Sequence, residues 1–202
     1  MTDATDQTLQ QMVDFGPQTR IVARLVDGVR EDQLDLPTPC PEYAVHHLLG
    51  HILGLTAAFG DAGRKNLGPT TDTSPRAQRP DITDGWRDAL AKALDDLAEV
   101  WRDPAAWQGM TRAGGVDLPG AVAAMVALDE LVVHSWDLAK ATGQDYAPDE
   151  AALQAAHAFL LQSAAGPRPD IFGPVVPVEE SATLLDRAVG LSGRDPGWKP
   201  DA

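Results

Sequence analysis

The chain has only one cysteine, Cys40, among 202 residues. A single thiol excludes an intramolecular disulfide and any cluster of thiolates around zinc or iron. The sequence also lacks an uninterrupted apolar run of about 18 or more residues, the length that a membrane-spanning helix needs. Its first residues are polar and acidic, unlike the basic and then apolar start of a signal peptide. These absences predict a cytoplasmic protein.

Basic residues are scarce as well. The sequence has 16 Lys and Arg against 30 Asp and Glu, which gives a formal net charge of −14 at pH 7. A field of this sign repels phosphate backbones and anionic lipid headgroups, so we expect neither nucleic acid nor a membrane surface as a partner. Apolar material for a core is present, because hydrophobic residues make up 44% of the chain. Such a chain is typical of one globular domain, here a monomer or a homodimer.

Apolar residues recur at helical spacing along most of the chain. Helices are expected over residues 9–29, 43–62, 84–101, 121–142, 149–165 and, in short form, 181–189. The first would cross Pro17, and Thr83 would cap the third. Paired glycines in residues 110–120 predict a turn or a short hairpin. The fold class is therefore all-α, with a bundle of four or five helices in residues 1–165 and a proline-rich tail, residues 166–202, packed on the same domain.

The longest apolar segment, residues 121–142, carries three ionisable side chains. Its circumference is apolar on all sides, so this helix should be central. At about 100° per residue, Glu130, His134 and Asp137 fall within about 60° of one another and face the same way. A buried carboxylate without a partner is expensive, so another group must compensate its charge.

A second polar stripe lies on the second expected helix, where His47 and His51 are one turn apart. If the bundle brings the two stripes together, His51, Glu130 and His134 provide two nitrogens and one oxygen. That set is typical of an open zinc site with one position left for water or substrate. The same residues are compatible with a buried hydrogen-bond network that holds no metal. Asp137 is a candidate for orienting a ligating imidazole, for a fourth ligand or for a catalytic base.

The remaining polar and aromatic candidates have simpler interpretations. Cys40 is expected to pack among prolines, since a reactive thiol needs a lowered pKa. His157 is expected to be a surface or core residue. Arg187 and Arg194 in the tail are expected in surface ion pairs, although an arginine near a pocket would clamp a substrate carboxylate. Trp86, Trp101, Trp107 and Trp136 offer apolar walls for such a pocket, although a tryptophan is more often a plain core residue.

Three segments resemble one protein family. They read TPCPEYAVHHLLGH at residues 38–51, ELVVHSWDLAKATG at 130–143 and GRDPGW at 193–198. The chain resembles the metal-binding proteins related to mycothiol-dependent maleylpyruvate isomerase, within the wider DinB-like superfamily. This resemblance implies a DinB-like four-helix bundle and a divalent metal, zinc or in some relatives nickel, at the positions of His51, Glu130 and His134. The isomerase continues into a distinct C-terminal domain, so its reaction does not carry over to this short tail.

Two classes of function follow from these residues. The first is an enzyme whose metal binds a low-molecular-weight thiol as thiolate, for sulfur transfer to a small electrophilic substrate or for its isomerisation. A variant of this class is a metal-hydroxide hydrolase with Asp137 as the base. The second class is a non-catalytic binding or sensing module in which the ion ties two helices together. An open coordination position favours the enzyme, and a saturated four-ligand site favours the module.

Overall fold

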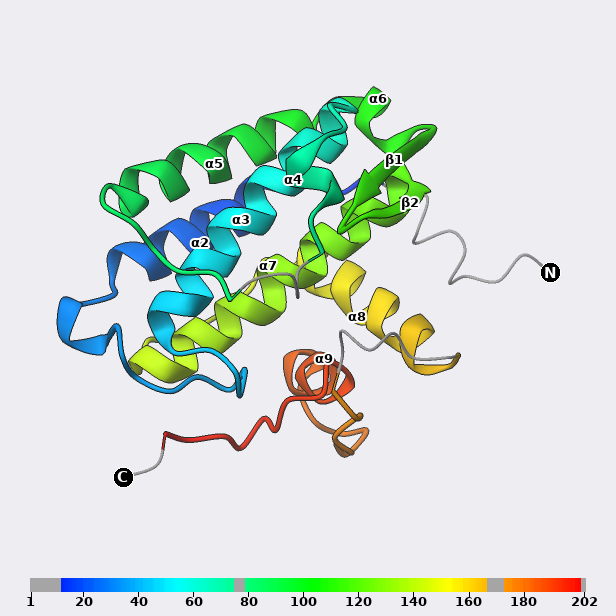
Figure 1. Ribbon diagram of the computed structural model, residues 1–202. Helices are drawn as coiled ribbons and strands as arrows, with labels where there is room; N and C mark the ends of the chain where they lie inside the picture. Colours follow the sequence, from blue (N-terminus) through cyan, green and yellow to red (C-terminus); the bar gives the residue numbers. More distant parts are fainter. Residues whose placement is uncertain (1–11, 75–78, 167–172, 201–202) are drawn as a thin grey trace.

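The computed structural model describes residues 12–74, 79–166 and 173–200 (Figure 1). Its four long bundle helices are α2 (Gly16–Asp27), α3 (Val45–Arg64), α5 (Trp86–Val100) and α7 (Gly120–Thr142). Helix α3 packs against both α5 and α7, and α2 contacts the same two helices from the other side. This arrangement confirms the all-α bundle.

Helix α7 lies at the centre of the molecule, as its sequence predicts. Leu128, Leu131 and Leu138 are buried on one side of it, and Val133, about 140° from Leu128 around the helix, is buried on another. Helices α2 and α3 pack on it, and α8 (Glu150–Ala164) covers a further side. Gly143 ends the helix with φ of 68°, a left-handed conformation that glycine adopts without steric cost. Because burial of each leucine contributes about 1.5–3 kcal/mol, α7 supplies a large part of the folding energy.

Shorter elements fill the spaces between the long helices. They are η1 (Glu31–Gln33), α4 (Pro69–Asp72), α6 (Pro104–Trp107), β1 (Met110–Ala113) and β2 (Val116–Pro119). The two strands pair antiparallel, with Met110 opposite Pro119, and form the expected hairpin. Gly114 and Gly115 make its turn with φ of 59° and 79°, which explains the paired glycines. The hairpin packs against α3 and α7.

The C-terminal segment attaches to the bundle through α8. Helix α9 (Leu184–Leu191) packs against α8, and a small apolar cluster of Val133, Leu160 and Ala188 joins α7, α8 and α9. Asp149 caps α8, because its Oδ1 accepts the backbone N–H of Ala152 at 3.0 Å. Figure 1 shows α9 and the chain that follows it below α7. This path brings residues near the C-terminus back to the central helix.

Two expected helix starts are wrong. The first helix does not cross Pro17, because α2 begins at Gly16 and residues 12–15 are not helical. Residues 9–11 of that expected helix lie outside the described part. Proline has no N–H to donate, so it fits the first turn of a helix better than its interior. Gly85, with φ of 77°, precedes α5, so the cap expected from the Thr83 side chain does not form.

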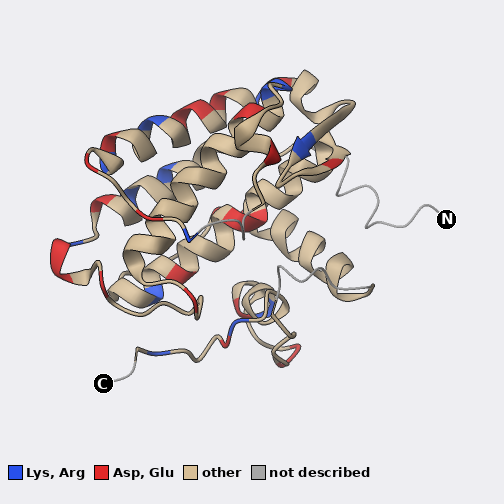
Figure 2. Ribbon diagram, in the orientation of Figure 1, with Lys and Arg blue, Asp and Glu red and all other residues tan. Residues whose placement is uncertain are grey.

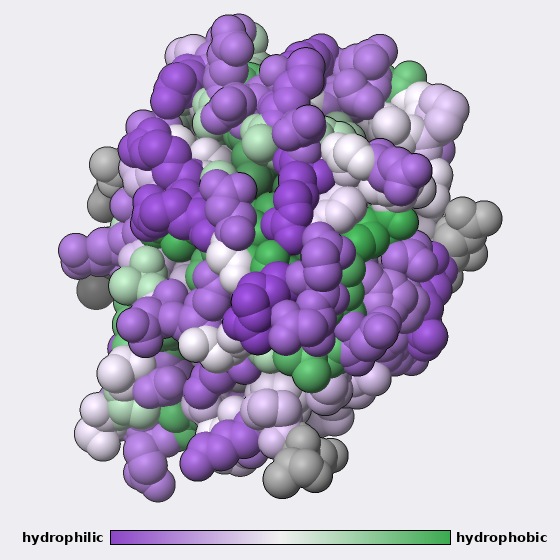
Figure 3. All heavy atoms as spheres, turned by 90° about the vertical axis from the view of Figure 1, so that its left-hand side faces the viewer, coloured by the Kyte–Doolittle hydropathy of each residue, from purple (hydrophilic) through white to green (hydrophobic). Residues whose placement is uncertain are grey.

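Charge is distributed unevenly over the helices. Figure 2 shows acidic and basic segments along α5, whereas α8 has no charged residue from 151 to 164. Helix α8 packs against α7 and α9, and its exposed positions carry uncharged residues, among them Gln154, Leu161 and Gln162. The face drawn in Figure 3 is mostly hydrophilic, with apolar residues only in patches. No helix of the described residues combines the length and apolar character needed to cross a bilayer.

The segment that leads into α5 touches α3 at one close point. A Cβ atom on Gly50 would lie 2.6 Å from the carbonyl carbon of Asp81, so the Asp81 backbone rests directly on the helix. Beside this contact, His46 Nδ1 lies 2.7 Å from Asp81 Oδ1. Glycine is therefore required one residue before His51.

Candidate metal centre

Two helices bring three of the predicted ligands together. His51 comes from α3, while Glu130 and His134 lie one turn apart on α7. The Nε2 atoms of His134 and His51 lie 3.0 Å and 3.7 Å from Glu130 Oε2, and the two imidazole rings are nearly perpendicular, at 86°. One ligand atom from each residue lies within 4.8 Å of the other two. The convergence predicted from the two stripes is therefore present.

The environment of the three side chains sets their charges. Burial disfavours ionisation of Glu130, but hydrogen bonds with His134 and His51 outweigh it and hold the pKa of its carboxyl well below the usual range. Burial would also lower the pKa of His134, yet hydrogen bonds with Asp137 and Glu130 raise that pKa to about 9. The pKa of His51 is lowered, mainly by burial. Without a metal, the site at neutral pH therefore holds a glutamate anion, a protonated His134 and a neutral His51.

Asp137 and Arg194 lie behind the three candidate ligands. Asp137 is fully buried, and its Oδ2 lies 2.9 Å from His134 Nδ1. Arg194 Nη2 donates to Oδ2 at 3.1 Å and Arg194 Nε to Oδ1 at 3.3 Å. Burial alone would raise the pKa of Asp137, but the charge of Arg194 and the hydrogen bond with His134 lower it. Asp137 is therefore an anion that turns His134 so that Nε2 faces Glu130.

The expectation of a surface ion pair for Arg194 is wrong. Its side chain is only 13% exposed, and its partner Asp137 is 57 residues away in the chain. The spacing of residues in the sequence does not reveal a contact between side chains so far apart in the chain. The one signal in the sequence is the GRDPGW segment, which resembles the family without showing what the arginine touches.

A proline-rich turn before α3 forms another edge of the centre. Thr38 Oγ1 donates to the carbonyl of Tyr43 at 2.8 Å and accepts the N–H of Cys40 at 3.1 Å. This turn sets the Tyr43 ring 5.4 Å from the His51 ring, centroid to centroid. Burial and the carboxylates of Asp137 and Glu130 raise the pKa of Cys40 to about 11. The Cys40 thiol is therefore neutral, as expected of a packing residue.

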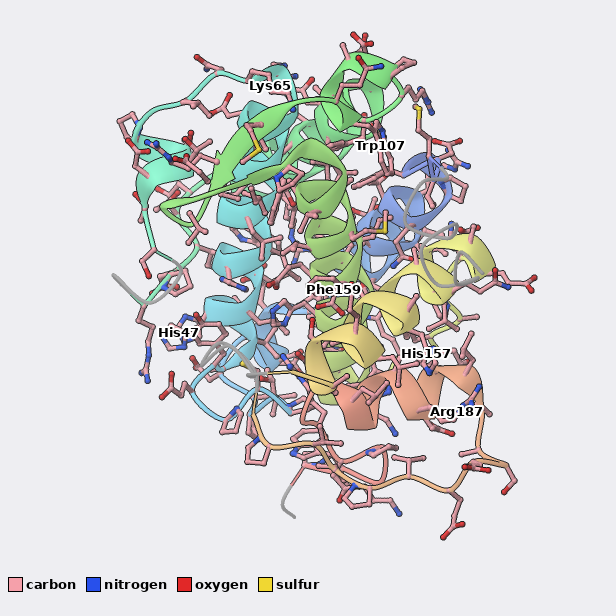
Figure 4. All side chains as sticks on the ribbon, turned by 90° about the vertical axis from the view of Figure 1, so that its right-hand side faces the viewer. His47, Lys65, Trp107, His157, Phe159 and Arg187 are labelled. Carbon is pink, nitrogen blue, oxygen red and sulfur yellow. The ribbon has the colours of Figure 1, made fainter. Side chains whose placement is uncertain are left out.

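The tryptophans predicted as pocket walls lie elsewhere. Trp101 stacks on Phe15 at 5.6 Å and packs against Gly63, which is twelve residues, or about 18 Å of helix, beyond His51. Trp107 lies at the same end, remote from His47 (Figure 4). Trp86 packs with the neighbouring Arg87.

Trp136, the fourth of these residues, packs with Lys140. It follows His134 by two residues and so points about 200° away from it on α7. His157 on α8 is not part of the centre, and burial and the positive charge of Arg187 on α9 lower its pKa. The surface ion pair expected for Arg187 is not found among the described residues, and its Nε atom is buried without a hydrogen-bond partner there.

A second cluster of possible ligands occurs at the start of α3. His46, His47 and Asp81 also bring ligand atoms within 4.8 Å of one another. The side chain of Asp81 is 59% exposed, and His47 Nδ1 accepts the backbone N–H of Ala44 at 3.3 Å. That tautomer places the remaining proton on Nε2, which leaves His47 without a free lone pair for a cation.

The inner group fits a divalent cation on the chemistry of its donors. Two imidazole nitrogens and one carboxylate oxygen face a common point, as in open zinc sites. Asp137 occupies His134 Nδ1, which leaves the Nε2 lone pair for a metal once the proton is lost. The fold and this donor set together define a class: DinB-like helical bundles with a possible metal-binding group between two helices.

The family follows from sequence comparison. Residues 15–139 match the family model described as the mycothiol maleylpyruvate isomerase N-terminal domain. This match covers more than half of the chain and includes His51, Glu130, His134 and Asp137. The chain belongs to this family, which confirms the resemblance seen in its motifs.

Individual relatives agree with the family match. Two proteins of Mycobacterium tuberculosis, uncharacterized protein MT0763 of strain CDC 1551 / Oshkosh and uncharacterized protein Rv0738 of strain ATCC 25618 / H37Rv, are each 30% identical over 149 residues, or 72% of this chain and 76% of theirs. The solved structure of a mycothiol-dependent maleylpyruvate isomerase superposes with a TM-score of 0.52 over 78% of this chain and 70% of its own, at 16% identity.

A single-residue mutant of the mycothiol-dependent maleylpyruvate isomerase gives a TM-score of 0.55 at 15% identity. This match covers 98% of the present chain and 83% of that structure, so it reaches into the C-terminal tail. At these identities the likeness shows a shared fold.

Proposed function

We propose that this chain binds a divalent metal ion through His51, Glu130 and His134 and uses it to bind a low-molecular-weight thiol. The observation that carries the proposal is the convergence of both Nε2 atoms on Glu130 Oε2. Zinc suits this donor set, and nickel is the alternative. A metal held there would lower the pKa of a bound thiol and keep it as the thiolate at neutral pH.

The charges of the centre support an anionic ligand. In the metal-free site, the positive charges of His134 and Arg194 balance the negative charges of Glu130 and Asp137. A divalent cation that displaces the His134 proton leaves the site with one unit of positive charge. A thiolate restores neutrality, so the site favours an anion of charge −1 over a neutral ligand or a dianion.

The donor count supports an enzyme more than a purely structural ion. In the described residues the group consists of three ligands, and structural zinc sites are usually closed by four. The substrate would be a small electrophile. Its reaction would be either sulfur transfer or cis–trans isomerisation, in which the thiolate adds to a conjugated double bond, rotation follows, and the same thiolate leaves.

Asp137 is assigned to positioning under this proposal. Both of its oxygens are engaged, by Arg194 and by His134, and its side chain is fully buried. A general base must reach the proton that it removes, which a carboxylate held in this way does not. The contacts of Asp137 therefore favour thiol chemistry over the hydrolase alternative.

The metal site is tested by elemental analysis of protein purified without chelators. The wild type should carry about one zinc or nickel ion per chain, and His51→Ala and His134→Ala should carry almost none. His46→Ala and His47→Ala are matched controls from the same helix and should keep the wild-type content. A wild type without metal, even after incubation with zinc, would refute the proposal.

Thiol binding is tested with the cobalt-loaded wild type. Titration with several small thiols should produce a thiolate-to-cobalt charge-transfer band in the near ultraviolet, and the same titration of His51→Ala should not. Metal-loaded protein that shows no band with any thiol would indicate the metal-hydroxide hydrolase or the non-catalytic module instead.

A further inference from the structure

The C-terminal tail inserts one arginine into the interior of the molecule. Arg194 follows α9 by three residues, and its side chain reaches Asp137 on the central helix. Nε and Nη2 donate to separate oxygens of that carboxylate, while Nη1 donates to the carbonyl of Ser192 at 3.1 Å. All three nitrogens of the guanidinium have acceptors within the protein. The arginine is therefore not arranged to bind a substrate carboxylate.

The contacts continue from Asp137 to the candidate ligands. Asp137 Oδ2 accepts from Arg194 and also lies 2.9 Å from His134 Nδ1, and His134 Nε2 lies 3.0 Å from Glu130. A carboxylate held by a two-pronged arginine keeps its plane, and the hydrogen bond to Nδ1 then fixes the orientation and tautomer of the imidazole. The position of Arg194 thus determines how His134 presents its Nε2 atom.

The tail is built to hold Arg194 in this place. The backbone N–H of Arg194 donates to the carbonyl of Val189, near the end of α9, at 3.1 Å. Gly193 has φ of 90°, and a Cβ atom there would lie 2.9 Å from the backbone of Gly173. Val176 N–H donates to the Gly190 carbonyl at 3.0 Å, which ties the segment before α9 to its end. Backbone contacts between α9 and the residues before and after it therefore hold Arg194 in place.

We propose that Arg194 is a positioning residue of the metal centre and that docking of the C-terminal tail is energetically coupled to metal binding. This inference rests on the proposed function of His51, Glu130 and His134. Coupling between two binding events is reciprocal. Loss of Arg194 should therefore lower the affinity for the metal, and bound metal should strengthen the docking of the tail.

The test compares the full-length wild type with Arg194→Ala, Arg194→Lys and Lys199→Ala. Lys199 is exposed in the same tail, so its replacement removes the same charge without touching Asp137. Competition with a chromophoric chelator gives the zinc affinity. Hydrogen exchange of residues 184–200, with and without zinc, reports tail docking. The visible spectrum of the cobalt-loaded proteins reports the ligand geometry, which a general loss of stability would leave unchanged.

The expected result is a loss of about 10-fold or more in zinc affinity for Arg194→Ala, with an altered cobalt spectrum. Arg194→Lys should be intermediate because it keeps the charge and loses the two-pronged contact, and Lys199→Ala should match the wild type. Zinc should slow exchange in residues 184–200 of the wild type but not of Arg194→Ala.

Two outcomes would overturn the coupling. If the wild type binds zinc and Arg194→Ala binds it equally well, with tail exchange independent of zinc, the inference is wrong while the metal site stands. If the wild type binds no zinc, both are wrong. Should Arg194→Ala fail to fold, tail exchange in the wild type decides: slowing by zinc supports the coupling, and no change overturns it.

Discussion

The two histidine clusters on α3 differ in what lies behind them. The outer cluster of His46, His47 and Asp81 has a 59% exposed carboxylate, and His46 Nε2 also lies 3.8 Å from the fully exposed Asp35. The inner cluster of His51, Glu130 and His134 has a buried Asp137 behind it, held by Arg194, whose side chain is 13% exposed. Both bring ligand atoms within 4.8 Å of one another. Close donor atoms alone therefore do not distinguish the two clusters, whereas the layer of side chains behind the inner cluster does.

The largest expected difference between the clusters is in folding stability. Asp137→Asn should lower the free energy of unfolding of the metal-free protein by about 3–5 kcal/mol, because Arg194 and His134 keep buried charges without their anion. Asp81→Asn removes an exposed carboxylate and should cost less than about 1 kcal/mol. Urea titrations of the two variants measure both values. Equal decreases in the free energy of unfolding would show that burial of Asp137 makes its contacts no more important for stability than those of the exposed Asp81.

The next difference concerns stabilisation by metal. Zinc at about 100 times its dissociation constant should raise the free energy of unfolding of the wild type by about 2.7 kcal/mol. The double variant His46→Ala/His47→Ala should keep this increment, and His51→Ala should lose it. Thermal or urea unfolding with and without zinc provides the measurement. Loss of the increment in the double variant alone would assign the metal to the outer cluster.

The smallest expected effect is a pH dependence of the metal-free protein. The pKa of His134 is about 9 in the folded state against 6.5 for an ordinary histidine, so its stabilising charge is fully present below pH 6.5 and is lost as the pH rises through 9. The free energy of unfolding should therefore decrease across this window. Urea midpoints at pH 6.5, 8 and 9.5 test the slope.

His46→Ala should keep this pH slope and His134→Ala should lose it. A wild-type protein that becomes more stable between pH 6.5 and 9.5 would contradict the assigned protonation of His134.

Local geometry made the inner cluster predictable. Glu130, His134 and Asp137 share one face because residues three and four positions apart on a helix always do, and an apolar surrounding marks that face as buried. Helix α7 was predicted within one residue of its start for the same reason, since Gly143 stops it and apolar residues fill it. That His51 lies opposite Glu130 was a prediction about packing, which the family resemblance supported.

Longer-range features were not predictable in this way. The contact between Arg194 and Asp137 spans 57 residues and depends on how α8 and α9 fold back over α7. The start of α2 depends on Pro17 being a good first-turn residue as well as a poor interior one. Trp136 is not a wall of the centre, and the sequence already indicates this, because its spacing from His134 places it on another face of the helix.

Gly50 links the outer segment to the inner site. A methyl group at this α-carbon would have to occupy the space of the Asp81 peptide, 2.6 Å away, and neither backbone has a flexible end that could yield. We expect any side chain at residue 50 to push the Asp81 backbone away from α3 and to tilt the helical turn that carries His51. The absence of a Cβ atom at Gly50 therefore helps to set the position of the next residue, His51.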